Sequence, residues 1–272
     1  MNRRKVSSPQ QELSKAKYKA FLLFTAIFPF LLLILAEATL RFAGYGSDLS
    51  LFTAQTINGR QLFFINPEVK SRYFARVDFT PNVSPDCFEM PKPDSTFRVF
   101  CLGGSTTAGF PYSFVGSFST FLRDRLKAMF PEWKIEVVNL GMTATNSFTV
   151  LDMAREVMDY QPDLLIVYDG HNEFYGALGV ASRESVFGSR WLTKLYLRLV
   201  HFRTFQLLRD LYLSVGTLFA GDDESAMTGT MMERLARGQY IPYGSDLYWR
   251  GYEIFKANVE ELADLCRRHR VP

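Results

Sequence analysis

The sequence predicts an α/β protein with a parallel sheet, preceded by one transmembrane helix. From residue 97 onward, short apolar runs typical of buried strands alternate with stretches whose apolar residues recur at helical spacing. Strands that alternate with helices in this way form parallel sheets covered on both faces. Before this region, residues 20–36 carry no charge, and a helix that continues to Leu40 reaches the roughly 20 residues that span a bilayer.

The composition is that of an ordinary globular protein, with 47% hydrophobic and 22% charged residues in a chain of 272. The net charge of +3 is uneven, because residues 1–19 hold six basic residues and one acidic residue. The basic character therefore belongs to the tail and gives no reason to expect nucleic-acid binding. The three cysteines, Cys87, Cys101 and Cys266, have no metal-binding or redox spacing, so we expect no metal, cofactor or disulfide framework.

The tail and the apolar segment together predict a membrane anchor. Residues 1–19 form a basic cytoplasmic tail, residues 20–40 a transmembrane signal anchor, and only Arg41 is basic just beyond it. Basic residues collect on the cytoplasmic side, so we expect a single-pass protein of the cell membrane with its main domain in the periplasm or otherwise outside the cytoplasm. The alternative is a cleaved signal peptide, because residues 36–38 fit a small-residue cleavage site, but the length of the tail and apolar run favours the anchor.

Residues 41–95 are expected to be an irregular lead-in segment and linker. Residues 62–65 and 73–79 have the pattern of short strands, and the prolines and aspartates between residues 81 and 94 mark the linker. The main domain then covers residues 96–272.

One candidate for a chemical site is the loop after the first predicted strand, residues 97–102. Gly103 and Gly104 break this strand, and Ser105 follows them, ahead of a helix that starts near Ser117. This order places a hydroxyl at the carboxyl edge of a parallel sheet, where ligands bind in open α/β folds.

Two known motifs do not fit this loop. A phosphate-binding loop requires Lys and then Ser or Thr after its second glycine, but Phe110 and Pro111 follow Gly109. The nucleophile elbow G-x-S-x-G requires glycine where Thr107 stands. Taken alone, the loop is best interpreted as a tight glycine turn with an incidental serine.

Three loops, each after a predicted strand, carry a resemblance to a known family. The strand at 134–140 leads into GMTATNS, and the strand at 164–168 leads into DGHNEFYG. GGSTT around Ser105, NLG around Gly141 and GHNE around Asn172 resemble, in this order, the first three sequence blocks of the SGNH (GDSL-type) hydrolases. The resemblance implies a flavodoxin-like three-layer α/β/α sandwich, in a family of esterases, lipases and carbohydrate acetylhydrolases or acetyltransferases.

The resemblance also implies a role for one residue of each loop. Ser105 is the nucleophile and, through its backbone N–H, one oxyanion donor; Gly141 gives a second N–H, and Asn172 a third donor from its amide. Serine acyl transfer needs such donors because its tetrahedral intermediate carries a negative oxygen. We therefore expect a serine hydrolase of acyl or acetyl esters, carried on a glycan or a lipid. The plainer alternatives are a turn glycine at Gly141 and a side chain–backbone turn contact at Asn172.

The chain departs from the family pattern within these blocks and at its carboxyl end. Gly104 stands where the family name has Asp, Thr106 where it has Leu, and Glu173 where an Asp usually follows the Asn. The family takes its general base from a late Asp-x-x-His, but the residues three positions before His171, His201 and His269 are Tyr168, Arg198 and Cys266. We therefore expect the domain to be incomplete at its carboxyl end, the base to lie beyond the chain, and the chain alone to be inactive.

Residues 177–244 leave the family pattern and predict a lid-like helical insertion. Residues 191–215 have the pattern of one helix or a broken pair, with an apolar face of Trp191, Leu195, Leu199, Phe202 and Phe205. Residues 183–209 carry six basic residues and one acidic residue. In a membrane-tethered protein such a helix either lies on the lipid surface or presents a solvated basic face over ordinary core.

Two other functions stay open from the sequence. One is an acyl- or acetyltransferase of an envelope polysaccharide, which uses the same serine with an alcohol as acceptor. The other is a non-catalytic SGNH-like binding module, which would not need the missing histidine.

Overall fold

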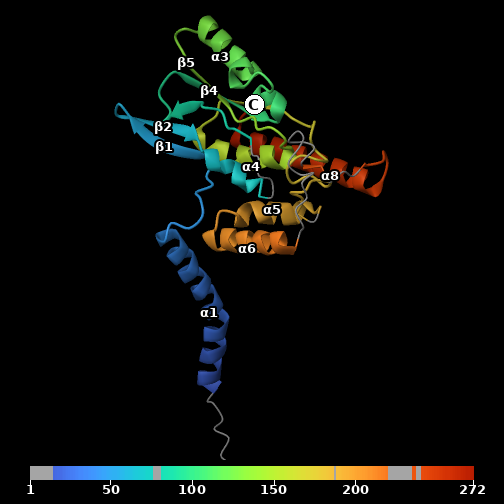
Figure 1. Ribbon diagram of the computed structural model, residues 1–272. Coiled ribbons are helices and arrows are strands. Elements are labelled where there is room, and N and C mark those ends of the chain that lie inside the picture. The colour runs from blue at the N-terminus through green and yellow to red at the C-terminus, as the bar shows by residue number, and fades with distance from the viewer. Residues whose placement is uncertain (1–14, 76–80, 187, 220–234, 237–239) are drawn as a thin grey trace, which may run out of the picture.

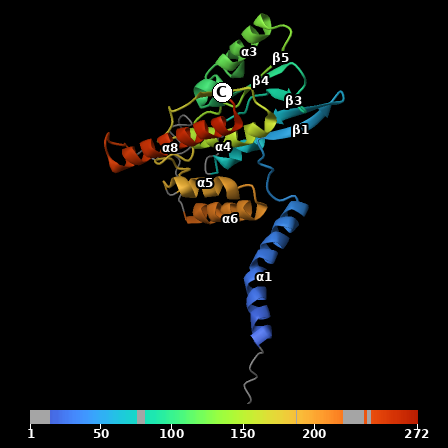
Figure 2. The ribbon, with the colours of Figure 1, turned by 180° about the vertical axis from the view of Figure 1, so that it is seen from behind.

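The structure is a computed structural model that describes residues 15–75, 81–186, 188–219, 235–236 and 240–272. An α/β domain lies at one end of a long amino-terminal helix, as Figures 1 and 2 show from opposite sides. In the described residues the parallel sheet has the strand order β5-β4-β6. Its strands are β4 (Thr96–Gly103), β5 (Lys134–Asn139) and β6 (Leu164–Tyr168). The predicted α/β class with a parallel sheet is thereby confirmed, whereas the three-layer sandwich stays a prediction.

The helices follow the order that the spacing predicts. They are α1 (Lys15–Phe42), α2 (Ser105–Ala108), α3 (Phe118–Met129), α4 (Ser147–Val157), α5 (Arg190–Leu199), α6 (Arg203–Phe219) and α8 (Asp246–His269). Short 3-10 helices are η1 (Pro67–Arg72), η2 (Phe114–Gly116) and η3 (Met158–Tyr160).

β4 is the centre of the sheet, and its side chains alternate between two apolar clusters. Val99 and Cys101 belong to a cluster that α3 covers with partly buried side chains. Phe100 and Leu102 belong to the larger cluster, to which α4 and α8 contribute. Because successive side chains of a strand point to opposite faces, α3 and α4 cover opposite faces of β4.

The lead-in segment packs into the same core. It contains an antiparallel sheet in the order β1-β2-β3, from β1 (Phe52–Ile57), β2 (Arg60–Ile65) and β3 (Cys87–Glu89). The rings of Phe52 and Phe88 lie 6.0 and 5.4 Å from that of Phe100. The strand predicted at 62–65 is confirmed within β2. The strand predicted at 73–79 is absent from the described residues 73–75, where a turn follows η1, and residues 76–80 lie outside the described residues.

α1 extends away from the domain as a single rod (Figure 1). Its segment Lys17–Phe42 is long and apolar enough to cross a membrane, and none of its most apolar window is buried by the protein. At about 1.5 Å per residue, a helix of 28 residues exceeds the roughly 30 Å of a bilayer's hydrocarbon core. The predicted apolar amino-terminal helix is thus confirmed, while the bilayer crossing and its orientation stay predictions.

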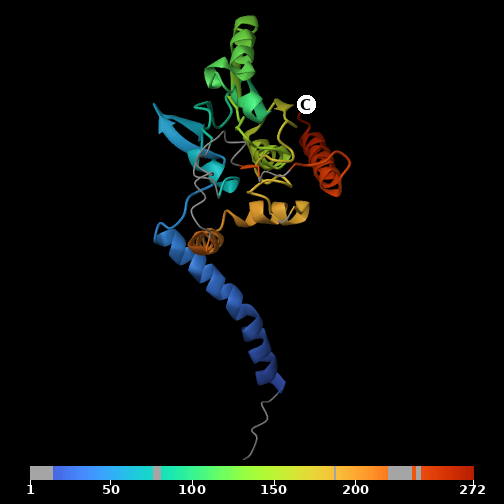
Figure 3. The ribbon, with the colours of Figure 1, turned by 45° about the vertical axis from the view of Figure 1, so that its right-hand side comes forward.

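The region 191–215, for which the sequence predicts one helix or a broken pair, contains α5 and most of α6, which lie between α1 and the sheet (Figure 3). Its predicted apolar face is divided. Leu195, Leu199 and Phe205 line a cavity. Trp191 and Phe202 are exposed, and the buried side chains of α5 are Thr193 and Leu197.

A buried arginine joins the two sheets. Arg98 in β4 is fully buried, and its Nε donates to Glu136 Oε2 in β5 at 2.7 Å. Its other nitrogens donate to the carbonyl oxygens of Glu89 (2.6 Å) and Tyr160 (2.7 Å), and the guanidinium lies 4.6 Å from the ring centre of Phe88. One cation therefore holds β3, β4, β5 and the end of η3 together.

We expect Glu136→Ala to lower the free energy of unfolding by about 3–5 kcal/mol, because it leaves the Arg98 charge buried without its counter-charge. Urea unfolding of the detergent-solubilised protein measures this. The exposed Glu132→Ala is the control and should change stability by under ~0.5 kcal/mol. The pair Arg98→Met with Glu136→Leu should lose less than Glu136→Ala, and an equal loss would contradict the argument.

Candidate active site

The first loop begins where β4 ends at Gly103. A Cβ at Gly103 would overlap the carbonyl oxygen of Tyr168 at the end of β6, and its φ of +154° is one that side chains rarely adopt. Only glycine therefore allows β4 to end this close to β6. Ser105 then starts α2 and is half-buried, and Thr107 Oγ1 donates to the same carbonyl of Tyr168 at 3.1 Å.

The second loop runs directly against α2. A Cβ at Gly141 would overlap the backbone nitrogen of Ala108 and would lie 2.6 Å from the carbonyl carbon of Thr107. The Asn139 side chain bridges the two segments, since its Nδ2 donates to Thr107 O and its Oδ1 accepts from the Gly141 N–H, both at 2.8 Å. The glycine of the NLG block therefore serves close packing, and its N–H is engaged with Asn139 in this structure.

The third loop brings Asn172 beside the first. Asn172 Nδ2 lies 3.3 Å, and Asp169 Oδ1 3.6 Å, from the position that a Cβ at Gly104 would occupy. Glycine at position 104, the departure from the family name, thus leaves room for both polar side chains next to the Ser105 turn. The structure brings the loops of Ser105, Gly141 and Asn172 together, while the catalytic roles of these three residues stay predictions.

Ala144 in the second loop was not singled out from the sequence. It is fully buried with a left-handed backbone (φ +61°), and its carbonyl oxygen accepts from the Ala177 N–H at 2.8 Å. Nothing in the residue type signals this, because alanine seldom adopts such a backbone.

A buried acidic pair lies behind the third loop. The carboxylate of Glu173 accepts from the N–H and the hydroxyl of Ser147, both at 2.8 Å, and Asn258 of α8 donates to that hydroxyl at 2.9 Å. The oxygens of Asp169 are buried and meet no conventional donor in the described chain. Burial raises the pKa of both carboxyls, and the Asp169 charge raises the pKa of Glu173 further. We therefore expect the pair to share one proton, held by Glu173 and directed at Asp169.

None of the three histidines hydrogen-bonds to Ser105 in the part of the chain that the structure describes. His171 is exposed in the third loop, with its ring edge-to-face against Tyr168 at 5.3 Å. His201 is half-buried after α5, where burial and the Arg72 charge lower its pKa. His269 is exposed in the last turn of α8. Likewise, the described residues hold no group of three or more potential metal ligands.

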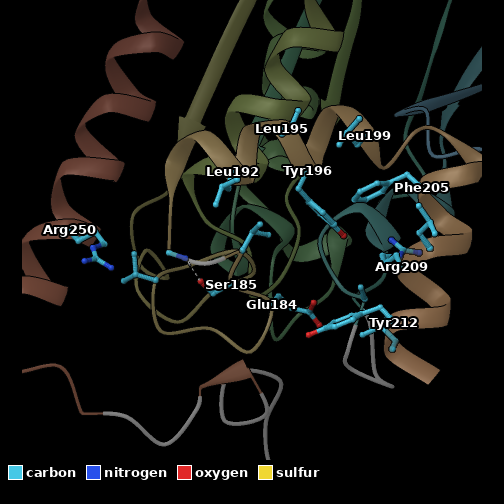
Figure 4. Close-up of a pocket in the computed structure, with 16 residues that line it drawn as sticks. Glu184, Ser185, Leu192, Leu195, Tyr196, Leu199, Phe205, Arg209, Tyr212 and Arg250 are labelled. Carbon is cyan, nitrogen blue, oxygen red and sulfur yellow. Dashed lines mark hydrogen bonds between the residues drawn. The ribbon is translucent and has the colours of Figure 1, made fainter. Parts of the chain in front are cut away.

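A cavity of about 690 Å³ lies elsewhere, between α5, α6 and the segment after the third loop (Figure 4). Tyr196 of α5 and Phe205 of α6 meet edge to face at its wall, with ring centres 5.8 Å apart. Polar side chains of Glu184, Arg209 and Arg250 also line it. Neither Ser105 nor Asn172 contributes to this cavity.

Comparisons with known proteins give remote structural likeness only. No model of a protein family matches the sequence, and no curated protein matches it. Solved structures that are similar to the chain include AlinE4, an SGNH-hydrolase family esterase (TM-score 0.26, 16% identity, 62% of this chain and 96% of that one). TesA is another, with a TM-score of 0.29 and 13% identity over 61% of this chain and 74% of that one. A third is a variant of Axe2, an acetyl xylan esterase from Geobacillus stearothermophilus. Its TM-score is 0.28, with 14% identity over 64% of this chain and 74% of that one. At TM-scores this low the likeness carries no argument, so the function is inferred from the residues themselves.

We expect Gly141→Ala to lower the free energy of unfolding by about 1–3 kcal/mol, because the added methyl group must push α2 away from the second loop. Thermal unfolding in detergent measures the change. Gly216→Ala is the matched control, since its Cβ meets nothing within 4 Å in α6 and alanine favours a helix by about 1 kcal/mol. Equal stability of Gly141→Ala and the wild type would contradict the close approach.

We expect the free energy of unfolding to fall as the pH rises from the unfolded carboxyl pKa of about 4.3 through the raised pKa of Glu173 in the folded protein. Above that pKa the folded protein must carry a second buried negative charge beside Asp169. Glu173→Gln stays neutral, so its stability should fall less between roughly pH 5 and pH 8 in urea titrations. The exposed Glu260→Gln should follow the wild type; a parallel decline of Glu173→Gln would refute the shared proton.

Proposed function

We propose that this chain is a membrane-tethered serine esterase domain of the SGNH type, which hydrolyses acyl or acetyl esters carried on a glycan or a lipid. The proposal is carried by the meeting of two loops at the carboxyl edge of the parallel sheet. Asn172 Nδ2 lies 3.3 Å from the Cβ position of Gly104, directly before Ser105. A half-buried serine beside an amide donor is the arrangement that acyl transfer requires.

In the proposed reaction, Ser105 Oγ attacks the ester carbonyl carbon while a general base takes its proton. The oxyanion of the tetrahedral intermediate then accepts hydrogen bonds from the Ser105 N–H and from Asn172 Nδ2. The Gly141 N–H joins them only if its bond to Asn139 opens. When the intermediate collapses, the ester C–O bond breaks and the alcohol leaves with the proton from the base. Water then attacks the acyl-serine, which releases the acid and restores Ser105.

We propose that the general base belongs to a segment that follows α8 and extends along the outer edge of β6. β6 pairs with β4 on one side. On the other side, the described residues supply one backbone contact, from the Leu165 N–H to Pro272 O at 3.0 Å. Val167 and Tyr168 of β6 are exposed, and Val271 is buried against the core. This partly exposed edge of β6 can accept a further strand.

We propose the domain order that the sequence predicts. Residues 1–19 form a cytoplasmic tail, 20–40 the membrane anchor, 41–95 the lead-in segment, and 96–272 the hydrolase-like domain with its insertion at 177–244. The helices on both faces of β4 support a flavodoxin-like sandwich for this domain. The fully exposed apolar surface of α1 supports the anchor, with the domain outside the cytoplasm.

A fluorophosphonate probe applied to the full-length protein, including any sequence that follows residue 272, should label Ser105. Ser105→Ala should abolish the labelling, because the probe reacts with an activated serine. Ser113→Ala, an exposed serine in the same segment, is the control and should label normally. Labelling that persists in Ser105→Ala would remove Ser105 from its proposed role.

Asn172→Ala should lower ester turnover on the order of 10²–10³-fold, the usual cost of one oxyanion donor.

A further inference from the structure

We propose that α6 lies in the interface of the membrane that α1 crosses, with one apolar stripe inserted among the lipids. The stripe consists of Leu208, Leu211, Tyr212 and Val215, and each of these side chains is more than half exposed. Their spacing of three, four and seven residues places them on one face of the helix. Leu208 and Tyr212 also line the cavity between α5 and α6. Exposed apolar patches of this kind mark protein or membrane contacts. The proposal rests on the proposed membrane anchor and is independent of the proposed esterase chemistry.

The attachment of α6 to α1 indicates that lipid covers this stripe. The Glu37 carboxylate in α1 accepts from the Arg203 N–H (3.0 Å), the Thr204 N–H (2.9 Å) and the Thr204 hydroxyl (3.0 Å) at the start of α6. Arg41 also donates to Glu37, at 2.7 Å. Glu37 therefore finds partners for its charge at the amino terminus of α6, where free N–H groups favour an anion.

This attachment sets the depth of α6. Glu37 lies within the candidate membrane span Lys17–Phe42, five residues before its end. At 1.5 Å per residue, the first turn of α6 lies about 8 Å below the end of α1 along its axis. Figures 1 and 3 show α6 running across the domain end of α1. An apolar helix face buried about 5–10 Å into the headgroup boundary is the usual arrangement of an interfacial helix.

Two contacts beyond α1 hold α6 in this position. The Tyr45 hydroxyl donates to Asp210 Oδ2 at 2.8 Å. Gln206 is buried and pairs with the backbone of Ser47, accepting from its N–H at 3.0 Å and donating to its oxygen at 3.2 Å. These contacts cover two turns of α6. The helix therefore cannot move away from the end of α1 without breaking them.

Basic residues of α5 and α6 form ion pairs and hydrogen bonds within the protein. Arg190 and Lys194 of α5 form ion pairs with Glu261 of α8 at 2.5 and 2.7 Å. Arg209 pairs with Asp210 at 3.3 Å and donates to Ser71 O at 3.0 Å. The contact with lipid therefore comes from the apolar stripe, and we expect it with uncharged as well as anionic lipids.

The test uses the full chain in phosphatidylcholine vesicles. The parent variant carries Cys87→Ser and Cys266→Ser, so that the label reacts only with the introduced cysteine, and it keeps the buried Cys101. Leu211→Cys carries an environment-sensitive NBD label. Met129→Cys on α3, another exposed apolar helix residue, is the matched control at the far end of the domain. We expect the label at 211 to shift its emission to the blue and to lose most of its fluorescence to doxyl lipids. We expect the label at 129 to be quenched by iodide in water instead.

Vesicle flotation and probe labelling of Ser105 in the same samples separate the outcomes. Protein that floats while the label at 211 is quenched by iodide and not by doxyl lipid overturns the inference and leaves the anchor intact. Protein that does not float overturns both, and loss of Ser105 labelling alone affects only the esterase. Val215→Cys repeats the test if Leu211→Cys does not fold. A label at 211 that responds to protein concentration and not to lipid indicates a protein partner and overturns the inference.

Discussion

The candidate site depends on how closely the loop after β5 approaches α2. No side chain fits at Gly141, because its place is taken by the backbone of α2. The Asn139 amide then fixes the distance by bonding to both segments. Gly103 imposes the same constraint between β4 and the end of β6. Two glycines at strand ends thus set where Ser105 and Asn172 lie, and the chemistry of the site follows from backbone packing rather than from any one polar contact.

Buried cations connect the lead-in segment to the domain that it precedes. Arg72 is fully buried, and it bonds to Asp152 of α4 at 3.0 Å and to Leu49 O at 2.5 Å. The Tyr73 hydroxyl also donates to Asp152, at 2.7 Å. Removal of one partner from such a pair costs more than the pair contributes, because the remaining charge stays buried. These contacts hold the described residues around η1 against α4.

The charges of the helix pair illustrate why residue counts alone mislead. Six basic residues between 183 and 209 suggested either a lipid-binding or a solvated basic face. In the fold, two of these six, Arg190 and Lys194, form ion pairs with Glu261 of α8. Arg155 of α4 also pairs with Glu261, so these contacts hold α5 against α4 and α8. This clustering also holds the pKa of Glu261 at about 2, against the effect of its partial burial. What α6 presents outward is an apolar stripe, which the charge count did not indicate.

The sequence by itself determined the features that depend on local spacing. These are the apolar helix α1 and the strands β4, β5 and β6 with their glycine and small-residue loops; for residues 191–215 the spacing allowed one helix or a broken pair. It also placed Ser105, Gly141 and Asn172 at strand ends. The tertiary structure alone decided that the Gly141 N–H bonds to Asn139, that Ala144 adopts a left-handed backbone, and that Glu173 and Asp169 share a buried site. The reason is physical: periodicity reports the preferences of a short segment, whereas these features arise from contacts such as that of Glu173 with Ser147, 26 residues apart.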